Sequence, residues 1–279
     1  MRFDSYHPMI NLIYFVTAIV CAVNFDHPVY LAISFLCAFV YSIKLNGKRS
    51  LIFNLCLIPL IGAYAAWYSY YNHFGITNLR MNFIGNQITL EAVTVGIVRG
   101  TKIAVVIMIF SCIFAVVSAD KVVYLFGRIS PRLSLYLSIL LRFVPRVKQR
   151  GQRIELSRRG IGKGCFQGNP LQCLLHMCSF LSILITWTLE DFMDSAASMK
   201  CRGYSLWGRT AFSIYRFDNR DRSFVIAIFA CITITLMAVA FNQTSIQYDP
   251  MIMMNRVTGM SVVFYGSYVV LLLLPMGLQ

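Results

Sequence analysis

Charged side chains are scarce in this sequence, and acidic ones are the scarcest. Only 13% of the 279 residues are charged, and just 11 are Asp or Glu. Because an average soluble domain carries about 25% charged residues, this shortage argues against an ordinary soluble enzyme. The hydrophobic content of 58% points instead to a chain that folds in a bilayer.

Sequence patterns for metal and nucleotide chemistry are missing as well. The nine cysteines include no pair separated by two residues and the four histidines form no ligand pair, so we expect free thiols and no metal or cofactor. The glycine-rich run Gly160-Ile161-Gly162-Lys163-Gly164 has the wrong spacing for a phosphate-binding loop, and no Ser or Thr follows its Lys. The chain is therefore predicted to have no ATP site and no catalytic residue of its own.

Long apolar runs are what the sequence does contain. A helix of roughly 17 to 25 residues crosses a bilayer core, and flanking Tyr, Trp and Asn can complete a run that is slightly short. We therefore predict an all-α integral membrane protein with about six transmembrane helices and long amphipathic cytoplasmic helices. The six runs without Asp, Glu, Lys or Arg are Met9–Val23, Val29–Ile43, Leu51–Tyr71, Ile103–Val117, Phe224–Gln243 and Val257–Gln279.

The placement of the basic residues predicts the orientation of these spans. Residues 119–222 hold 17 of the 25 Lys and Arg, and the loop Lys44–Ser50 is also basic, whereas the loop Asn24–Pro28 has no basic residue. Since Lys and Arg near a span favour the cytoplasmic side, the N-terminus and the central block are predicted to be cytoplasmic. The basic block then needs no nucleic acid as a partner. Alternation of the spans places Asn72–Leu90 and Thr244–Arg256 outside.

The same counts divide the chain into three parts. Residues 1–118 are predicted to form an N-terminal bundle of four spans, 119–222 a cytoplasmic or membrane-surface coupling region, and 223–279 the C-terminal spans. Within the coupling region, Asp120–Ile129 has the pattern of a surface helix. Residues 1–8 lack the charge pattern of a cleavable signal peptide, so the first apolar run is expected to remain as a span.

Two long helices are predicted in the coupling region. The first, Pro131–Arg159, has leucines at three- and four-residue spacings, and its basic stripe contains Arg142, Arg146, Gln149, Arg150 and Arg153. The second runs from about Pro170 to Arg202. Its uncharged half, Leu171–Leu189, contains Gln172, His176, Ser179 and Ser182 and leads directly into acidic residues, so we interpret it as a buried or surface helix. The alternative, a seventh span, would place the C-terminus outside.

Both long helices finish on an Arg-Gly pair. The first ends Arg158-Arg159-Gly160 and the second Cys201-Arg202-Gly203. An Arg at the last turn favours the helix dipole and presents a five-donor fork, and the following Gly permits a left-handed cap. Two helices that simply end in the usual way are an equally good interpretation of these pairs taken alone.

With their surroundings, these ends resemble the transmembrane coupling component of energy-coupling-factor transporters, whose cobalt-transport relatives belong to the same family. That family carries two short motifs of a small residue, Arg and Gly at the ends of its coupling helices. Three further stretches resemble the family: Ser130-Pro131-Arg132, Leu140-Leu141-Arg142-Phe143-Val144-Pro145 and Val98-Arg99-Gly100. Arg209-Thr210 fits the continuation of the second motif.

The resemblance implies a scaffold subunit of a vitamin or metal-ion importer in a bacterial cytoplasmic membrane. Two ABC ATPase subunits are its expected partners, and a small substrate-binding membrane subunit is expected on the bilayer side. Ala is usual at the first motif position, where this chain has Arg158 and Cys201, so the first key contact is either Arg158 or Arg159. The implied ATPase contacts are Arg158, Arg159, Gly160, Cys201, Arg202 and Gly203, and the implied docking residues are Leu137, Leu141, Arg142 and Pro145.

Three other classes compete with this interpretation. The permease of an ordinary ABC importer is the closest, because only the paired Arg-Gly ends argue against it. A secondary transporter would use ionisable groups in the membrane, and Glu91, Arg99 and Lys102 lie beside the fourth span. A membrane-embedded transferase would need two acidic pairs for a metal–diphosphate substrate, and only Asp191 and Asp194 form one.

Overall fold

The computed structural model describes residues 3–72, 74–81, 87–204, 206, 215, 217–248, 252–254 and 258–277. Contacts divide the chain into two compact units. Unit 1 comprises Met1–Ser118 and Tyr215–Gln279, and unit 2 comprises Ala119–Ile214.

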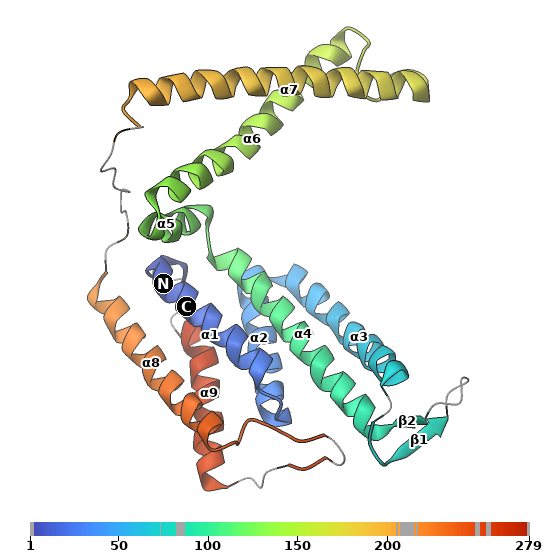
Figure 1. Cartoon of the computed structure of the whole chain (residues 1–279), viewed down its shortest axis with the longest axis vertical. Helices are drawn as coiled ribbons and strands as arrows, with labels where there is room; N and C mark the ends of the chain where they lie inside the picture. The colour runs from blue at the N-terminus through green and yellow to red at the C-terminus, as the bar shows by residue number, and fades with distance from the viewer. Residues whose placement is uncertain are drawn as a thin grey trace. The chain divides into compact units, whose positions relative to one another are not determined.

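Unit 1 is a bundle of helices, and each of the six predicted apolar runs forms one of them (Figure 1). The fourth helix starts well before Ile103, where the uncharged run begins, because the charged residues of its first turns find partners in unit 1. The bundle helices are α1 (Pro8–Asn24), α2 (Pro28–Asn46), α3 (Lys48–Tyr71), α4 (Leu90–Val116), α8 (Asn219–Ala240) and α9 (Gly259–Gly277).

Two of the loops between the bundle helices meet at one end of this bundle. The backbone N–H groups of Asp26 and His27, between α1 and α2, both donate to the carbonyl of Thr244 after α8, at 3.0 Å. Lys102, in the middle of α4, contacts the first of these loops, since its Nζ lies 2.7 Å from Asp26 Oδ1. The loop Asn24–Pro28 and the start of the loop after α8, which the charge pattern predicts on one side of the membrane, therefore lie together.

The opposite end gathers the remaining termini of the bundle. Lys44 near the end of α2 donates to the carbonyl of Met276 at the end of α9, at 2.9 Å. The ring of Phe3 lies 5.7 Å from that of Phe224 at the start of α8. The hydroxyl of Ser111, in the last turns of α4, accepts a hydrogen bond from the side chain of Asn46 at the end of α2. The chain thus leaves unit 1 after α4 and returns at α8 on the same side.

The return of the chain to the same end of the bundle limits which helices can cross the membrane. Six described helices are long and apolar enough to span: α2, α3, α4, α7, α8 and α9, while the 17-residue α1 is shorter. A segment that returns to its starting side crosses an even number of times, so α7 would need a second span beside it. The other long helix of unit 2 carries four arginines in its middle, each costing about 3 kcal/mol at the bilayer centre. We therefore count α1 and leave α7 outside, which retains six spans.

Close packing of α3 on α4 depends on two glycines whose packing role the sequence analysis did not predict. A Cβ built on Gly96 would lie 2.9 Å from Ala65 Cα, and one on Gly100 would lie 3.2 Å from the carbonyl oxygen of Ile61. Glycines four residues apart on one helix face are a common device for close helix approach in membranes. Gly96 and Gly100 therefore define the face of α4 that contacts α3.

A short antiparallel ribbon links α3 to α4 and was not predicted. It pairs β1 (Asn78–Met81) with β2 (Gln87–Thr89). The hydroxyl of Thr77 donates to the Glu91 carboxylate at 2.6 Å, which ties the ribbon to the first turn of α4.

Unit 2 contains α5 (Ala119–Ile129), α6 (Pro131–Gly160) and α7 (Pro170–Cys201). The three helices match the predicted ranges within two residues, and α6 runs through Pro145 without a break. Antiparallel contacts join α6 to α7. The rings of Phe143 and Phe192 stack at 4.6 Å, and Arg150 pairs with Asp191 at 2.7 Å.

Candidate functional site

The end of α7 has the geometry that the Arg-Gly pair predicts. Gly203 adopts a φ of 75°, and its N–H donates to the carbonyl of Lys200 at 3.0 Å. The N–H of Tyr204 reaches back to the carbonyl of Met199 at 3.2 Å. These two bonds form a Schellman motif, in which a left-handed glycine closes the helix. Arg202 is the residue directly before that glycine, at the very end of α7.

The end of α6 has the same motif in a different register, and the prediction that Gly160 supplies its cap is wrong. Gly160 is the last helical residue, and Gly162 is the left-handed one with a φ of 76°. The N–H groups of Gly162 and Lys163 donate to the carbonyls of Arg159 and Arg158, at 3.1 and 2.9 Å. A second glycine two residues on lets the helix continue before it closes.

This register separates the two helix ends. Arg202 lies one residue before its capping glycine, whereas Arg159 lies three residues before Gly162 and Arg158 lies four before it. Arg159 and Arg202 are therefore not structurally equivalent, and their shared position before a Gly in the sequence does not identify which arginine of α6 is the counterpart of Arg202.

The side-chain environments of the two α6 arginines differ more clearly. Arg158 is half-buried and turns back on its own unit, where it donates to the carbonyls of Lys163 and His176 at 3.2 and 3.3 Å. Arg159 is 59% exposed and pairs with Glu155 one turn earlier, at 2.9 Å. An exposed i,i+4 pair contributes only about 0.3 to 0.5 kcal/mol, so a partner could take Arg159 from it at little cost.

Arg202 is the least engaged of the three arginines. Its side chain is exposed and makes no hydrogen bond or ion pair with any residue that the structure describes. Cys201 beside it is also exposed, and its thiol is free. The end of α7 therefore offers an unpaired guanidinium to solvent or to a partner.

Glu155 organises the chain that follows α6. Its carboxylate accepts the backbone N–H of Cys165 at 3.2 Å as well as the Arg159 guanidinium. Hydrogen bonds from Cys165 and then from Arg159 hold the pKa of the Glu155 carboxyl below its ordinary value, so the group stays charged at neutral pH. Burial, reinforced by this carboxylate, raises the pKa of the Cys165 thiol. Sequence reasoning missed Glu155, although its spacing of four residues from Arg159 is a readable signal.

The residues expected to hold the substrate-binding subunit all lie on α6. Leu137 is half-buried, while Leu141, Arg142 and Pro145 are exposed. The structure therefore brings the four onto one helix, and three of them are accessible.

An extended apolar surface on unit 2 accompanies them. No described residue of α7 is buried, although the helix is rich in Leu, Ile, Met and Trp. Monomeric proteins rarely expose apolar patches larger than a few hundred Å². The most exposed large apolar side chains on α6 and α7 are Tyr136, Val144, Leu156, Leu171, Leu175 and Met193.

The charged residues beside the fourth span all have partners at the loop end of unit 1. Lys102 pairs with Asp26 and donates to the carbonyl of Val23, both at 2.7 Å. The Arg99 guanidinium lies 4.8 Å from the centre of the Tyr68 ring. Together with the Thr77 bond to Glu91, these contacts give each charge a structural role.

The remaining candidates add no further chemistry. Among the described residues, no three His, Cys, Asp or Glu side chains lie close enough to hold a metal ion, and all nine cysteines are free. Ser130-Pro131-Arg132 forms the start of α6, and Arg209-Thr210 lies outside the described residues. Comparison with known protein families finds no model that matches this chain, and no curated protein matches it either.

Proposed function

We propose that this chain is the membrane scaffold of an energy-coupling-factor importer, which connects two cytoplasmic ATPase subunits to a small substrate-binding membrane subunit. One observation carries the proposal. Two crossing helices of unit 2 each end in a glycine-capped turn beside an exposed arginine, Arg159 on α6 and Arg202 on α7. Two such ends on one subunit suit a pair of similar ATPases, each with one groove.

In this proposal the two arginines bind the ATPases, and the contacts between α6 and α7 transmit the movement of the helix ends. Each guanidinium enters a groove on one ATPase, where its planar fork bonds carboxylate or carbonyl oxygens. Closure of the ATPases on ATP moves the two helix ends, and the energy comes entirely from those subunits. The motion passes along α6 and α7 because the Phe143–Phe192 stack and the Arg150–Asp191 pair join the helices where they cross.

The difference between Arg158 and Arg159 supports a choice between them. Arg158 already donates to two carbonyls of its own unit, and a partner that took its guanidinium would have to replace both bonds. Arg159 needs to give up only the Glu155 pair. We therefore assign the first ATPase contact to Arg159 and give Arg158 the role of holding the segment between α6 and α7.

The substrate-binding subunit is assigned to the apolar surface of unit 2. The exposed leucines of α6 and the uncovered face of α7 would be unfavourable in water, and a membrane partner that docks there would bury them. Shifts of α6 and α7 would then tip the docked subunit and open its binding site. The substrate, a vitamin or metal ion in this class of importer, belongs to that subunit.

The orientation that goes with this function places unit 2 and the N-terminus in the cytoplasm of a bacterial cell. It rests on the basic residues of 119–222, which leave and rejoin unit 1 at the same end. An impermeant thiol reagent on intact cells should label a cysteine introduced at residue 245 but not one at residue 163, measured in a variant without native cysteines. Labelling at residue 163 from outside would overturn the orientation.

Identification of the proteins that co-purify in mild detergent tests the function. The proposal expects ATPase subunits together with a separate small membrane protein. Recovery of ATPases with a soluble binding protein and no small membrane protein would favour the permease of an ordinary ABC importer. Transport by the purified chain alone, driven by an ion gradient, would favour a secondary transporter.

A further inference from the structure

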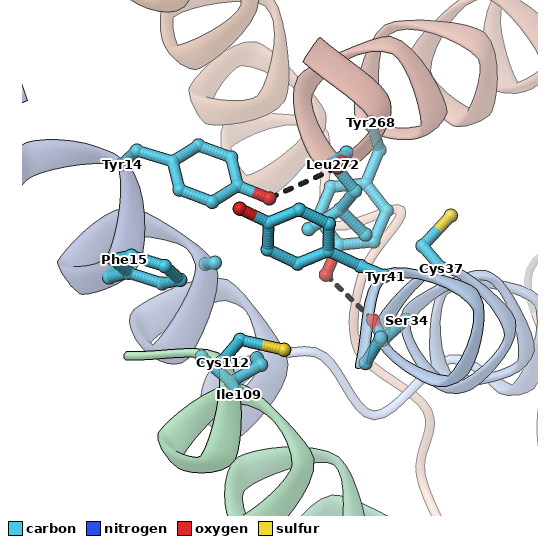
Figure 2. Close-up of a pocket in the computed structure, with 11 residues that line it drawn as sticks. Tyr14, Phe15, Ser34, Cys37, Tyr41, Ile109, Cys112, Tyr268 and Leu272 are labelled. Carbon is cyan, nitrogen blue, oxygen red and sulfur yellow. Dashed lines mark hydrogen bonds between the residues drawn. The ribbon is translucent and has the colours of Figure 1, made fainter. Parts of the chain in front are cut away.

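A small cavity lies inside unit 1, where α1, α2, α4 and α9 meet. Its volume is about 20 Å³, and a cavity of roughly 10 to 15 Å³ is large enough for one water molecule. Polar groups from several helices line it. Figure 2 shows Tyr14, Tyr41 and Tyr268 around the space, with Cys112 at its α4 side.

Two of the three tyrosines have direct hydrogen-bond partners. The Tyr14 hydroxyl donates to the carbonyl of Leu272 at 3.0 Å. The Tyr268 hydroxyl lies 2.7 Å from Ser34 Oγ, so one of these two groups donates to the other. Once its proton is used, the Tyr14 oxygen still has lone pairs that can accept a hydrogen bond.

Tyr41 is the exception. Its side chain is 4% exposed, and its hydroxyl makes no hydrogen bond to any residue that the structure describes. In Figure 2 its ring extends from α2 into the cavity, with the hydroxyl directed toward that of Tyr14. A buried hydroxyl without a partner is destabilising, and a bilayer offers none from outside the protein.

We infer that the cavity is a binding site for one ordered water molecule, which bridges Tyr41 to Tyr14. The water accepts a hydrogen bond from the Tyr41 hydroxyl and donates one to the Tyr14 oxygen. Every hydroxyl group that lines the cavity then has a partner, and α1 is connected to α2 through the water. This inference concerns the bundle of unit 1 alone and does not rest on the proposed transport function.

Tyr30 provides a matched control within the same bundle. It is also fully buried, and its hydroxyl likewise has no partner among the described residues. Unlike Tyr41, it does not line the cavity. Tyr30 and Tyr41 therefore match in burial and in the lack of a hydrogen-bond partner within the described part of the chain, and only Tyr41 should respond to a probe of water in the cavity.

Hydroxyl-radical footprinting with short X-ray pulses makes that comparison, because radicals form from water where it is bound. The full-length protein in lipid nanodiscs, equilibrated in ¹⁸O water, should incorporate ¹⁸O at Tyr41 and Tyr14 several-fold more than at Tyr30. Tyr41→Phe, which no longer needs the water, should lower the incorporation at Tyr14, whereas Tyr30→Phe should not.

Equal incorporation at Tyr41, Tyr14 and Tyr30 in the wild-type protein would overturn the inference, and that result does not depend on whether any variant folds. A folded Tyr41→Phe protein with unchanged incorporation at Tyr14 would also contradict it, since the water would then be held by other groups.

Discussion

Unit 1 buries large apolar side chains such as Met108 and Tyr268 completely, whereas α7 of unit 2 buries none of its described residues. Both units contain apolar helices, yet unit 1 packs them helix against helix, whereas α7 of unit 2 leaves its apolar side chains exposed. Unit 1 therefore has a core of its own. Unit 2 exposes an apolar surface of the kind that a partner covers, which agrees with the coupling role proposed for it.

Truncation of a methionine in each unit should give the largest contrast in stability. Met108 on α4 is fully buried, so Met108→Ala should lower the free energy of unfolding by about 2 to 5 kcal/mol, because the surrounding helices cannot refill the cavity. Met193 on α7 is 67% exposed, and Met193→Ala should change the free energy of unfolding by less than about 0.5 kcal/mol. Thermal or denaturant unfolding in detergent measures both.

Equal losses from the two methionine variants would contradict the comparison. They would mean that unit 2 has a packed core in the isolated chain.

A smaller effect should come from closing the gap between α3 and α4. Gly96→Ala would place its Cβ 2.9 Å from Ala65 Cα, so the backbones must separate, which typically costs about 1 to 3 kcal/mol. Gly62 on α3 has nothing within 4 Å of its Cβ position, and Gly62→Ala should be neutral or stabilise the helix by up to about 1 kcal/mol. Unfolding midpoints of the two variants check this, and an unchanged midpoint for Gly96→Ala would refute the close approach.

Charge introduced on the exposed face of α6 should affect a partner rather than the fold. Leu141→Asp should weaken docking of the small membrane subunit by at least about tenfold, or 1.4 kcal/mol, and leave the ATPases bound. Gln149→Asp adds the same charge to the basic stripe of α6 and should retain both partners. Co-purification of each variant checks this. Loss of the ATPases with retention of the small subunit would reverse the assignment of the two surfaces.

The helices of both units could be predicted because their signals are local. Runs without charge located the six bundle helices, and proline and glycine at the boundaries located α6 and α7. The start of α4 could not be found in this way, since Glu91, Arg99 and Lys102 interrupt the apolar pattern. They are accommodated by Thr77, Tyr68 and Asp26, which come from other segments.

The candidate site was predicted in part for the same reason. The sequence located both arginine-bearing helix ends but not which glycine of the Gly160-Ile161-Gly162 run closes α6. It also did not separate Arg158 from Arg159, because the bonds of Arg158 to the carbonyls of Lys163 and His176 depend on how the chain folds back after α6. The cavity beside Tyr41 depends on how four helices pack, which no local pattern encodes.

Alanine variants of Arg159 and Arg202 test the central claim, that each of these two helix ends binds one ATPase subunit. Truncating one side of a desolvated charged contact typically costs about 2 to 5 kcal/mol, so each attachment should weaken by tens- to thousands-fold. Arg159→Ala or Arg202→Ala alone should stop uptake while one end still holds the complex, and the double variant should release the ATPases. Lys at either position should rescue poorly, because it lacks the planar fork.

The decisive measurement is substrate uptake together with ATPase retention for these variants and for Arg158→Ala, whose side chain bonds its own unit. The account predicts no uptake in either single variant and loss of the ATPases in the double one. Normal uptake in both Arg159→Ala and Arg202→Ala would contradict it. An inactive Arg158→Ala protein that has lost ATPase binding, beside a normal Arg159→Ala protein, would contradict the assignment of the first contact to Arg159.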